Sequence, residues 1–362
     1  MDFFLTNLFA ASALGVGTDA TLANYRRRRA PGMTELVGDI PSRSLRFGLV
    51  PGELPAIAEP RWDMRSCRLV KLAVEGLGGA LERLVARYGA DRVGLVLGAS
   101  NTGIDEAQRF VSDWLGTGVK PPAFDLSMIE LGTPSLYLKE VLGVRGPAYT
   151  VSTACSSATK AFGSAMRLME SGRCDAMVVG GVDGRCRFAM NGFHALGALS
   201  AGVCRPLAPD RDGINLGEAV ALFTLEREPS ATGPVVRLRG VGESSDAHHA
   251  TAPDPEGRGA EAAMRAALAA ADLAPVDVDY VNLHGTGTVA NDEMEMKAFR
   301  RVFTAGRTAY ESTKDLTGHC LGAAGAIEAA ICWLRIASGE IRTALSNSFA
   351  FGGSNASVVL SS

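Results

Sequence analysis

The sequence predicts an α/β fold that is duplicated into two pseudo-symmetric halves with buried sheets. Two observations carry this prediction: strand-like segments alternate with helical ones, and the same order of features occurs twice along the chain. In each half a helical run leads into a short apolar strand, and a second helix then leads into another strand. The repeat is one of pattern and not of residue identity.

The segments of the repeat follow one another in order. In the first half, the helical segment 67–89 precedes the strand-like segment 91–103. The segment 148–172 then precedes the strand-like segment 175–184. In the second half, the corresponding pairs are residues 259–273 with 278–288 and residues 310–339 with 344–360. The halves meet near residues 234–242 without a Pro/Ser-rich linker. We therefore expect an N-terminal half at 1–233 and a C-terminal half at 234–362, packed into one body.

Composition narrows the class of protein. The 362 residues are 47% hydrophobic and 21% charged, as in an ordinary globular protein with a large core. A net charge of −3 gives no overall field that would attract nucleic acid, so an acidic partner would need a local basic patch. The seven cysteines form no C-x-x-C pair and no zinc spacing, which is typical of a reduced, cytoplasmic protein without a metal site.

The apolar N-terminus, MDFFLTNLFAASALGVG, is compatible with a secretion signal or with a buried strand. It carries Asp2 where a signal peptide has positive charge, so we interpret it as the first buried strand. No segment reaches the apolar length of about 18 residues that a transmembrane helix needs. We therefore expect no membrane association.

Cys155 lies in VSTACSSA, where an expected strand ends and a helix begins. Free cysteine is among the most buried residue types, so a structural thiol is one interpretation. The other is a nucleophile, because the N–H groups and dipole at a helix N-terminus stabilise a thiolate and lower the thiol pKa. The residues alone leave both interpretations open.

Two of the five histidines lie in Gly/Thr loops that join a strand to a helix. His284 in NLHGTGT and His319 in TGHCLGAAG have glycine neighbours, which let backbone and substrate approach closely. Ligands of α/β folds gather at strand carboxyl ends and helix N-termini, so we expect both histidines to converge on Cys155. A catalytic and a structural role remain open for each, whereas His194 is interpreted as structural.

The segment NSFAFGGSN, residues 347–355, contains a Gly-Gly turn before the last strand. It is compatible with a simple tight turn. It is equally compatible with a loop that flexes at Gly352 and Gly353 and presents a backbone N–H to a developing oxyanion.

Six motifs follow one another in a fixed order. They are STACSSA, RPLAPDRDGINLGEA, ESSDAHHATAPDPEG, NLHGTGTVANDEMEMKAF, STKDLTGHCLGAAGAIEA and NSFAFGGSN. In this order they resemble the decarboxylating β-ketoacyl-acyl-carrier-protein synthases of the thiolase superfamily. The resemblance extends from about Arg61 to the C-terminus. It implies a thiolase-like layered αβαβα fold.

The resemblance also implies a Cys-His-His site made of Cys155, His284 and His319. In such a site the cysteine accepts an acyl chain from a phosphopantetheine thioester. The histidines hydrogen-bond the carbonyl of a malonyl thioester while it loses CO₂, and the carbanion attacks the acyl-enzyme. The implied reaction is a decarboxylative Claisen condensation, in fatty acid synthesis or in a specialised polyene or polyketide pathway. The short chain favours the specialised route.

Further roles follow from the resemblance alone. The N–H groups of Cys155 and Phe351 match the oxyanion hole, and Phe351 also matches the gate residue. Lys314 and Glu328 match a charged pair that supports the second histidine, although by residue type they would be ordinary surface or helix charges. The implied substrate contacts are Thr286 and Thr288, which hold the pantetheine arm, with Phe349 and Gly352 of the gate loop. By residue type, the threonines would be local turn caps.

Substrates are expected on the 4'-phosphopantetheine arm of an acyl carrier protein, and no bound cofactor is expected. Carrier proteins are acidic, so a basic docking patch is predicted. Arg65, Arg68 and Lys71 recur at helical spacing and are the candidates, with a solvated helix face as the alternative. We also expect pairing, as a homodimer or with a related ketosynthase or chain-length-factor subunit. RRRR at 26–29 is assigned no role.

The chain departs from the family pattern in several places. It is shorter than expected before residue 60 and between about 100 and 140, and in the family the second of these regions contributes to the dimer interface and the acyl pocket. Ala350 stands where the gate loop usually has glycine, which restricts its backbone.

Two other hypotheses remain. One is a non-catalytic chain-length-factor subunit, against which the intact Cys155 argues. The other is a thiolase or acyltransferase without decarboxylation, against which the second histidine argues. A nicotinamide site is not expected, because GGVDG lacks the G-x-G-x-x-G spacing.

Overall fold

The computed structural model describes residues 2–41, 43–229, 233–303 and 306–362. Within these ranges, one mixed sheet has eleven strands and a small sheet has three. The large sheet contains β1 Phe4–Ser12, β2 Gly15–Val16, β5 Val93–Gly98, β6 Ala148–Val151, β7 Ala176–Asp183, β9 Ala219–Glu226, β10 Val236–Ser245, β11 Tyr280–Asn282, β12 Ala309–Glu311, β13 Thr343–Ala350 and β14 Ser354–Ser361. The small sheet contains β3 Met33–Leu36, β4 Leu45–Gly48 and β8 Leu216–Gly217.

The large sheet repeats one strand order. Its first half runs β6-β5-β7-β9-β1 and its second half runs β12-β11-β13-β14-β10. In both halves the first three strands are parallel and the next two pair antiparallel. The halves join where β1 pairs with β10. Strand order and direction therefore confirm the predicted duplication, which the residue identities do not show.

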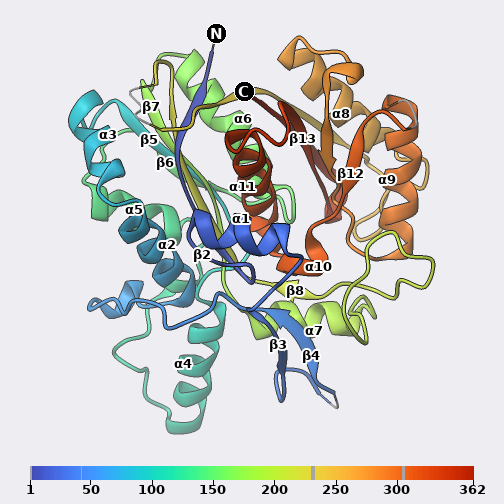
Figure 1. Ribbon diagram of the computed structural model, residues 1–362. Coiled ribbons are helices and arrows are strands. Elements are labelled where there is room, and N and C mark those ends of the chain that lie inside the picture. Colours follow the sequence, from blue (N-terminus) through green and yellow to red (C-terminus); the bar gives the residue numbers. More distant parts are fainter. Residues whose placement is uncertain (1, 42, 230–232, 304–305) are drawn as a thin grey trace.

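Helices form three layers around the two halves of the sheet (Figure 1). The α-helices are α1 Thr18–Arg26, α2 Arg65–Gly76, α3 Ala80–Tyr88, α4 Ile104–Thr117, α5 Thr133–Leu142, α6 Ser157–Glu170, α7 Arg187–Ala195, α8 Arg258–Ala271, α9 Val289–Val302, α10 Lys314–Thr317 and α11 Ala324–Ala337. The 3₁₀ turns are η1 Pro60–Trp62, η2 Leu126–Ile129, η3 Pro275–Asp277, η4 Leu321–Ala323 and η5 Phe351–Gly353.

Apolar contacts account for the layers. α6 and α11 share a central core with both halves of the sheet, and Ala158, Phe162, Ile327 and Ala330 are buried in it. α2, α3 and α5 pack on the outer face of the first half. α8 and α9 pack on the outer face of the second half. The order of layers is therefore αβαβα, as the sequence predicted.

Two expected helices are divided in the structure. The helix predicted over residues 67–89 is wrong as a single element, because Gly78 and Gly79 adopt φ of 55° and 78° and separate α2 from α3. The segment 310–339 contains β12, α10 and η4 before α11 begins. The apolar N-terminus forms strand β1, as predicted. No helix in the described ranges is long and apolar enough to cross a membrane.

Candidate active site

Three side chains from separate loops meet between the two halves. Cys155 lies between β6 and α6, His284 follows β11, and His319 lies between α10 and η4. The Nε2 atom of His319 is 2.9 Å from the Sγ atom of Cys155. The two imidazole rings have centroids 5.3 Å apart and cross at 80°. All three side chains are buried, so the structure brings together the trio that the sequence singled out.

The turn that carries Cys155 has an unusual backbone. Ala154 adopts φ of 51°, in the left-handed region that residues with a Cβ seldom occupy. Ser157 stabilises this turn, because its Oγ accepts from Thr153 N at 2.8 Å and donates to Ala154 O at 2.5 Å. Strain of this kind persists only where the surrounding structure fixes it. The sulfur is thus presented at the start of α6 by a turn that local contacts hold in place.

The three groups are neutral in the free protein. Burial raises the pKa of the Cys155 thiol to about 12, although the Lys314 charge acts in the opposite direction. Burial lowers the pKa of His319 well below its usual value, and Lys314 adds to the effect. His284 shifts in the same direction for the same reasons. The expected lowering of the thiol pKa is therefore wrong for the unliganded site, because desolvation outweighs the positive neighbours.

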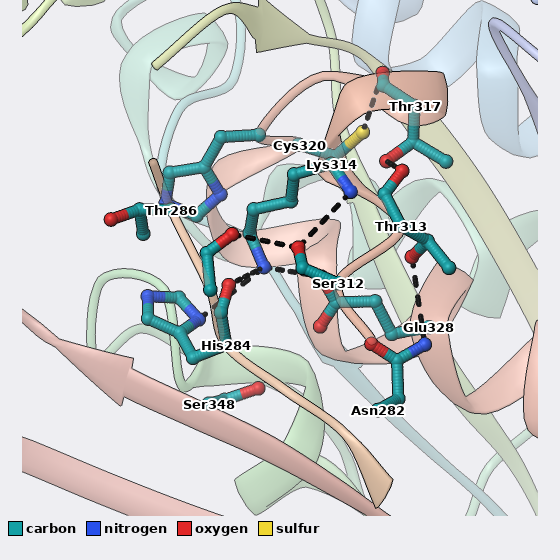
Figure 2. Close-up of polar contacts among 12 residues, drawn as sticks. Asn282, His284, Thr286, Ser312, Thr313, Lys314, Thr317, Cys320, Glu328 and Ser348 are labelled. Atoms are coloured by element: carbon teal, nitrogen blue, oxygen red, sulfur yellow. Dashed lines mark hydrogen bonds and ion pairs between the residues drawn. The ribbon is translucent and has the colours of Figure 1, made fainter. Parts of the chain in front are cut away.

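A buried ion pair lies against His284 (Figure 2). The Lys314 ammonium donates to the His284 carbonyl at 2.5 Å and lies 3.4 Å from its Nδ1, and it also bonds Glu328 Oε1. The Lys314 and Glu328 side chains are each only 1% exposed, so neither is an ordinary surface charge. These contacts place the pair beside the first histidine rather than the second. Ser312 Oγ also donates to Gly285 O at 2.7 Å and holds the start of α10 against the His284 loop.

Glu295 is a functional candidate that sequence reasoning missed. Its carboxylate accepts from the backbone N–H groups of His284 at 2.8 Å and Gly285 at 2.7 Å. Asn347 Nδ2 donates a third bond at 3.1 Å. Burial raises the pKa of Glu295 to about 7. The signal was present in the sequence, because Glu295 falls four residues before Phe299 on the apolar stripe of α9, where a charge needs a partner.

A mostly apolar cavity of about 230 Å³ opens over the trio. The predicted substrate residues Thr286 and Thr288 line it, with their Oγ atoms 2.9 Å apart. Phe349 also lines it and presents its ring to His284, at 6.1 Å between centroids. The cavity therefore gathers three of the four predicted substrate contacts over the nucleophile, and Gly352 is not among its lining residues.

The gate loop closes one side of this cavity. Phe351 lines it, is 39% exposed, and packs on Phe193 at 5.7 Å between ring centroids. Gly352 has φ of 77° and donates its N–H to Ala250 O at 2.7 Å. Ala350 has φ of −113°, an ordinary extended value, so glycine is not required at this position. The positive φ values of the loop fall at Gly352 and Gly353 instead.

The three basic residues predicted to bind a carrier protein lie on α2, outside this cavity. Arg65 makes two bonds of 2.5 Å to the buried Glu218, and Arg68 makes bonds of 2.6 and 2.5 Å to Asp63. Lys71 Nζ donates to Ala56 O at 2.7 Å. Helical spacing did not reveal these partners, which belong to other segments of the chain, and the docking role of the three residues stays a prediction.

Family descriptions match both halves of the chain. Residues 74–231 match "Beta-ketoacyl synthase, N-terminal domain", and residues 235–347 match "Beta-ketoacyl synthase, C-terminal domain". Nodulation protein E of Rhizobium meliloti is 35% identical, over 94% of this chain and 95% of that protein. The 3-oxoacyl-[acyl-carrier-protein] synthase 2 of Staphylococcus aureus is 33% identical, over 75% of this chain and 77% of that protein.

A solved structure extends the likeness to three dimensions. A chain from the complex of the ketosynthase ApeO with its chain length factor ApeC, from Xenorhabdus doucetiae, superposes with a TM-score of 0.93. It is 39% identical, and the match covers 99% of this chain and 98% of that one. Fold and family together define an acyl-transferring condensing enzyme of the thiolase-like class. The chain belongs to the β-ketoacyl synthase family.

Proposed function

We propose that this protein condenses an acyl chain held on Cys155 with a malonyl unit on an acyl carrier protein, giving 3-ketoacyl carrier protein and CO₂. The observation that carries the proposal is the 2.9 Å contact between Cys155 Sγ and His319 Nε2 beside a second buried histidine. The residues that line the cavity add a route for a substrate arm to reach Cys155. No cofactor is invoked, because the substrate thioesters and these side chains supply every group that reacts.

In the first step, the Cys155 sulfur attacks the carbonyl of the incoming thioester. A new S–C bond forms at Cys155, the S–C bond to the phosphopantetheine breaks, and the thiol proton passes through His319 Nε2 to the departing sulfur. The N–H groups of Cys155 and Phe351 are the proposed oxyanion hole. Ser156 and Ser354 support this pairing, because their Oγ atoms lie 3.0 Å apart and link the start of α6 to the gate loop.

In the second step, the two imidazoles donate hydrogen bonds to the malonyl thioester carbonyl while CO₂ departs. Lys314 is only a donor, so the Nδ1 of His284 that faces it accepts, and the His284 proton is on Nε2. The enolate carbon then attacks the acyl group on Cys155, and the expelled Cys155 thiolate takes a proton from solvent to restore the thiol. Lowered histidine pKa values keep both imidazoles neutral, so His319 accepts the thiol proton with a bare Nε2 in the first step and carries its single proton on Nε2 when it donates in the second.

The proposed carrier is an acyl carrier protein with a 4'-phosphopantetheine arm. Thr286 and Thr288 would hold the arm, and Phe349 and Gly352 would border the route to Cys155. Arg65, Arg68 and Lys71 stay the predicted docking residues, each with about a third of its side chain exposed. An acidic partner would have to compete with Asp63 and Glu218 for the two guanidinium groups.

We also propose that the chain pairs with a second chain of the same fold, either a copy of itself or a chain-length-factor subunit. Large apolar side chains are exposed throughout residues 104–150, among them Leu115, Leu126, Leu136 and Tyr149. Surfaces of this kind mark protein interfaces. The similar chain comes from a complex of a ketosynthase with its chain length factor, and this likeness favours a specialised pathway over primary fatty acid synthesis.

Two smaller proposals remain from the sequence. The N-terminal half is residues 1–233 and the C-terminal half is 234–362, a division supported by β10, which begins at Val236 and is the first strand of the second half along the chain. A cytoplasmic location is supported by the seven free cysteines.

The reaction is tested by intact-mass analysis after incubation with acyl-loaded carrier protein. The wild-type chain is expected to gain one acyl group, and Cys155→Ala is expected to gain none. An adduct that survives in Cys155→Ala would reject the nucleophile. If the wild-type chain gains no adduct with any carrier thioester, the non-catalytic chain-length-factor hypothesis takes its place.

Decarboxylation is tested separately with malonyl carrier protein. His284→Ala and His319→Ala are each expected to lower the release of CO₂ by about 10²–10⁴-fold, the usual contribution of a positioned acid or base. Acylation of Cys155 should persist in His284→Ala, which lacks only the more distant imidazole. Unchanged CO₂ release in both variants would remove the histidines from the mechanism.

A further inference from the structure

Asp183 is a fully buried carboxylate at the end of β7 that has no part in the proposed chemistry. Its oxygens accept from Ser100 N at 3.0 Å, Ser100 Oγ at 2.7 Å, Asn101 N at 2.8 Å and Gly322 N at 2.6 Å. Every one of these partners is a donor, which favours the ionised carboxylate, whereas burial acts against it and raises the pKa of Asp183 to about 7. Gly322 lies three residues after His319, so Asp183 links the first half of the protein to the loop that carries the second histidine.

The His319 loop is otherwise held near the histidine by main-chain contacts. His319 N donates to Asn215 O at 2.6 Å, and Gly217 N donates to His319 O at 3.0 Å. The ring itself has one polar contact, from Nε2 to Cys155, and its Nδ1 has no hydrogen-bond partner among the described residues. Among the described residues no second hydrogen bond orients the imidazole, which otherwise packs edge-on against the His284 ring. Its position therefore depends on where the backbone of this loop lies.

The loop is tightest where it meets Asp183. Leu321 adopts φ of 51°, a strained value for a residue with a Cβ. A Cβ on Gly322 would lie 2.6 Å from Ser100 N and 2.7 Å from Asp183 Oδ2, so the backbone itself is packed against the carboxylate. The bond from Gly322 N to Asp183 thus stabilises a strained turn directly after the histidine.

We propose that Asp183 is a positioning residue that fixes the His319 loop and, through it, the contact between His319 Nε2 and Cys155. The structural part of this inference stands on geometry alone, and its effect on turnover rests on the function proposed above. The Asp183 charge also raises the pKa of the Cys155 thiol, and only burial raises it more. The carboxylate therefore acts on both Cys155 and His319.

The test is Asp183→Asn, which keeps the shape but places an NH₂ group against backbone donors. The matched control is Glu226→Gln. Glu226 is a buried carboxylate on β9, and its backbone lies opposite Ala176, at the other end of β7 from Asp183. Three quantities are measured on the full chain: the ¹⁵N signals of the histidine rings, the rate of malonyl carrier decarboxylation, and the melting temperature. The His319 signal is assigned with His319→Ala, which is practical because the chain has five histidines.

Asp183→Asn is expected to shift the His319 signal while the signals of His248 and His249 stay in place. Decarboxylation should fall about 10- to 100-fold, the scale of a misplaced catalytic group. The control should leave the His319 signal and the rate unchanged even if it melts at a similar temperature. An unshifted His319 signal in Asp183→Asn, or an equal loss of activity in the control, would overturn the inference.

Two further outcomes are covered by the design. If Asp183→Asn does not fold, Ser100→Ala removes the 2.7 Å donor to Asp183 together with a longer, 3.3 Å acceptor of Gly322 N, and should shift the His319 signal in the same direction; no shift overturns the inference. If the wild-type chain does not decarboxylate malonyl carrier protein, the proposed function fails, and the histidine signals alone decide whether Asp183 positions the loop.

Discussion

The Cys155 thiol illustrates how one residue is governed by competing effects. Its place at the start of α6 and the nearby Lys314 charge favour a thiolate, whereas burial disfavours it. Burial outweighs both and raises the pKa of the thiol to about 12, so the neutral thiol is the favoured form at neutral pH. Reaction requires a substrate in place and an acceptor for the proton, which His319 provides at 2.9 Å.

This state predicts the pH dependence of alkylation. The rate at which iodoacetamide modifies Cys155 should rise about tenfold per pH unit between about pH 7 and pH 10 without a plateau, because only the thiolate reacts and its fraction grows in proportion to hydroxide. Intact mass against time gives the rate, and Cys155→Ala supplies the background from the six other buried cysteines. A plateau below about pH 9 would show instead that the helix N-terminus and Lys314 outweigh burial.

At the scale of elements, the site is assembled by loops that buried charges fix to their neighbours. Lys314 at the start of α10 bonds both the His284 loop and Glu328 on α11. Glu295 on α9 binds two N–H groups of the same loop. Buried charges of this kind are costly to leave unpaired, so each pair specifies one arrangement of its elements. The histidine loops are therefore fixed by tertiary contacts and not by their own sequence.

The Lys314–Glu328 pair gives a stability prediction. Lys314→Met and Glu328→Leu should each lower the free energy of unfolding by about 3–5 kcal/mol, because each leaves one buried charge without its partner. The double variant should be less destabilised than the sum of the two, since both charges are then gone. Urea denaturation measures the three values. Arg145→Met, which removes a fully exposed ion pair with Asp91, is the control and should not move the unfolding midpoint. Strict additivity in the double variant would contradict the pairing.

At this scale, the sequence could predict only those features that depend on contacts between residues close together in the chain. Alternating strands and helices and the loop positions of Cys155, His284 and His319 are local patterns, and the structure places all three together as expected. Glu295 and Asp183 were missed because their partners are backbone N–H groups of distant loops, which no spacing reveals. The bond from Arg65 to Glu218 was missed for the same reason, since the two residues are 153 positions apart. Contacts between halves had to be seen in the structure.

At the scale of the whole molecule, the duplication explains why the site lies where it does. The first half supplies the nucleophile and the second supplies both histidines, and α6 and α11 lie side by side between the two halves of the sheet (Figure 1). The isolated halves would lack a complete site. The same architecture leaves β6 as the last strand of the large sheet, with Tyr149 37% exposed on it. Unpaired edge strands are surfaces that proteins normally cover.

The edge strand β6 and its apolar surroundings predict the state of the chain in solution. α4, η2, α5 and β6 follow one another in residues 104–151 and expose Leu115, Leu136 and Tyr149. Leu136→Glu should weaken self-association or association with a related subunit, because it places a charge within an apolar contact. Light scattering after size exclusion measures the mass against the 37.8 kDa chain. Val37→Glu alters a more exposed apolar residue, which follows β3 and lies outside residues 104–151, and should leave the mass unchanged. A wild-type chain that is a monomer alone and with related ketosynthase subunits would show that this face has another partner.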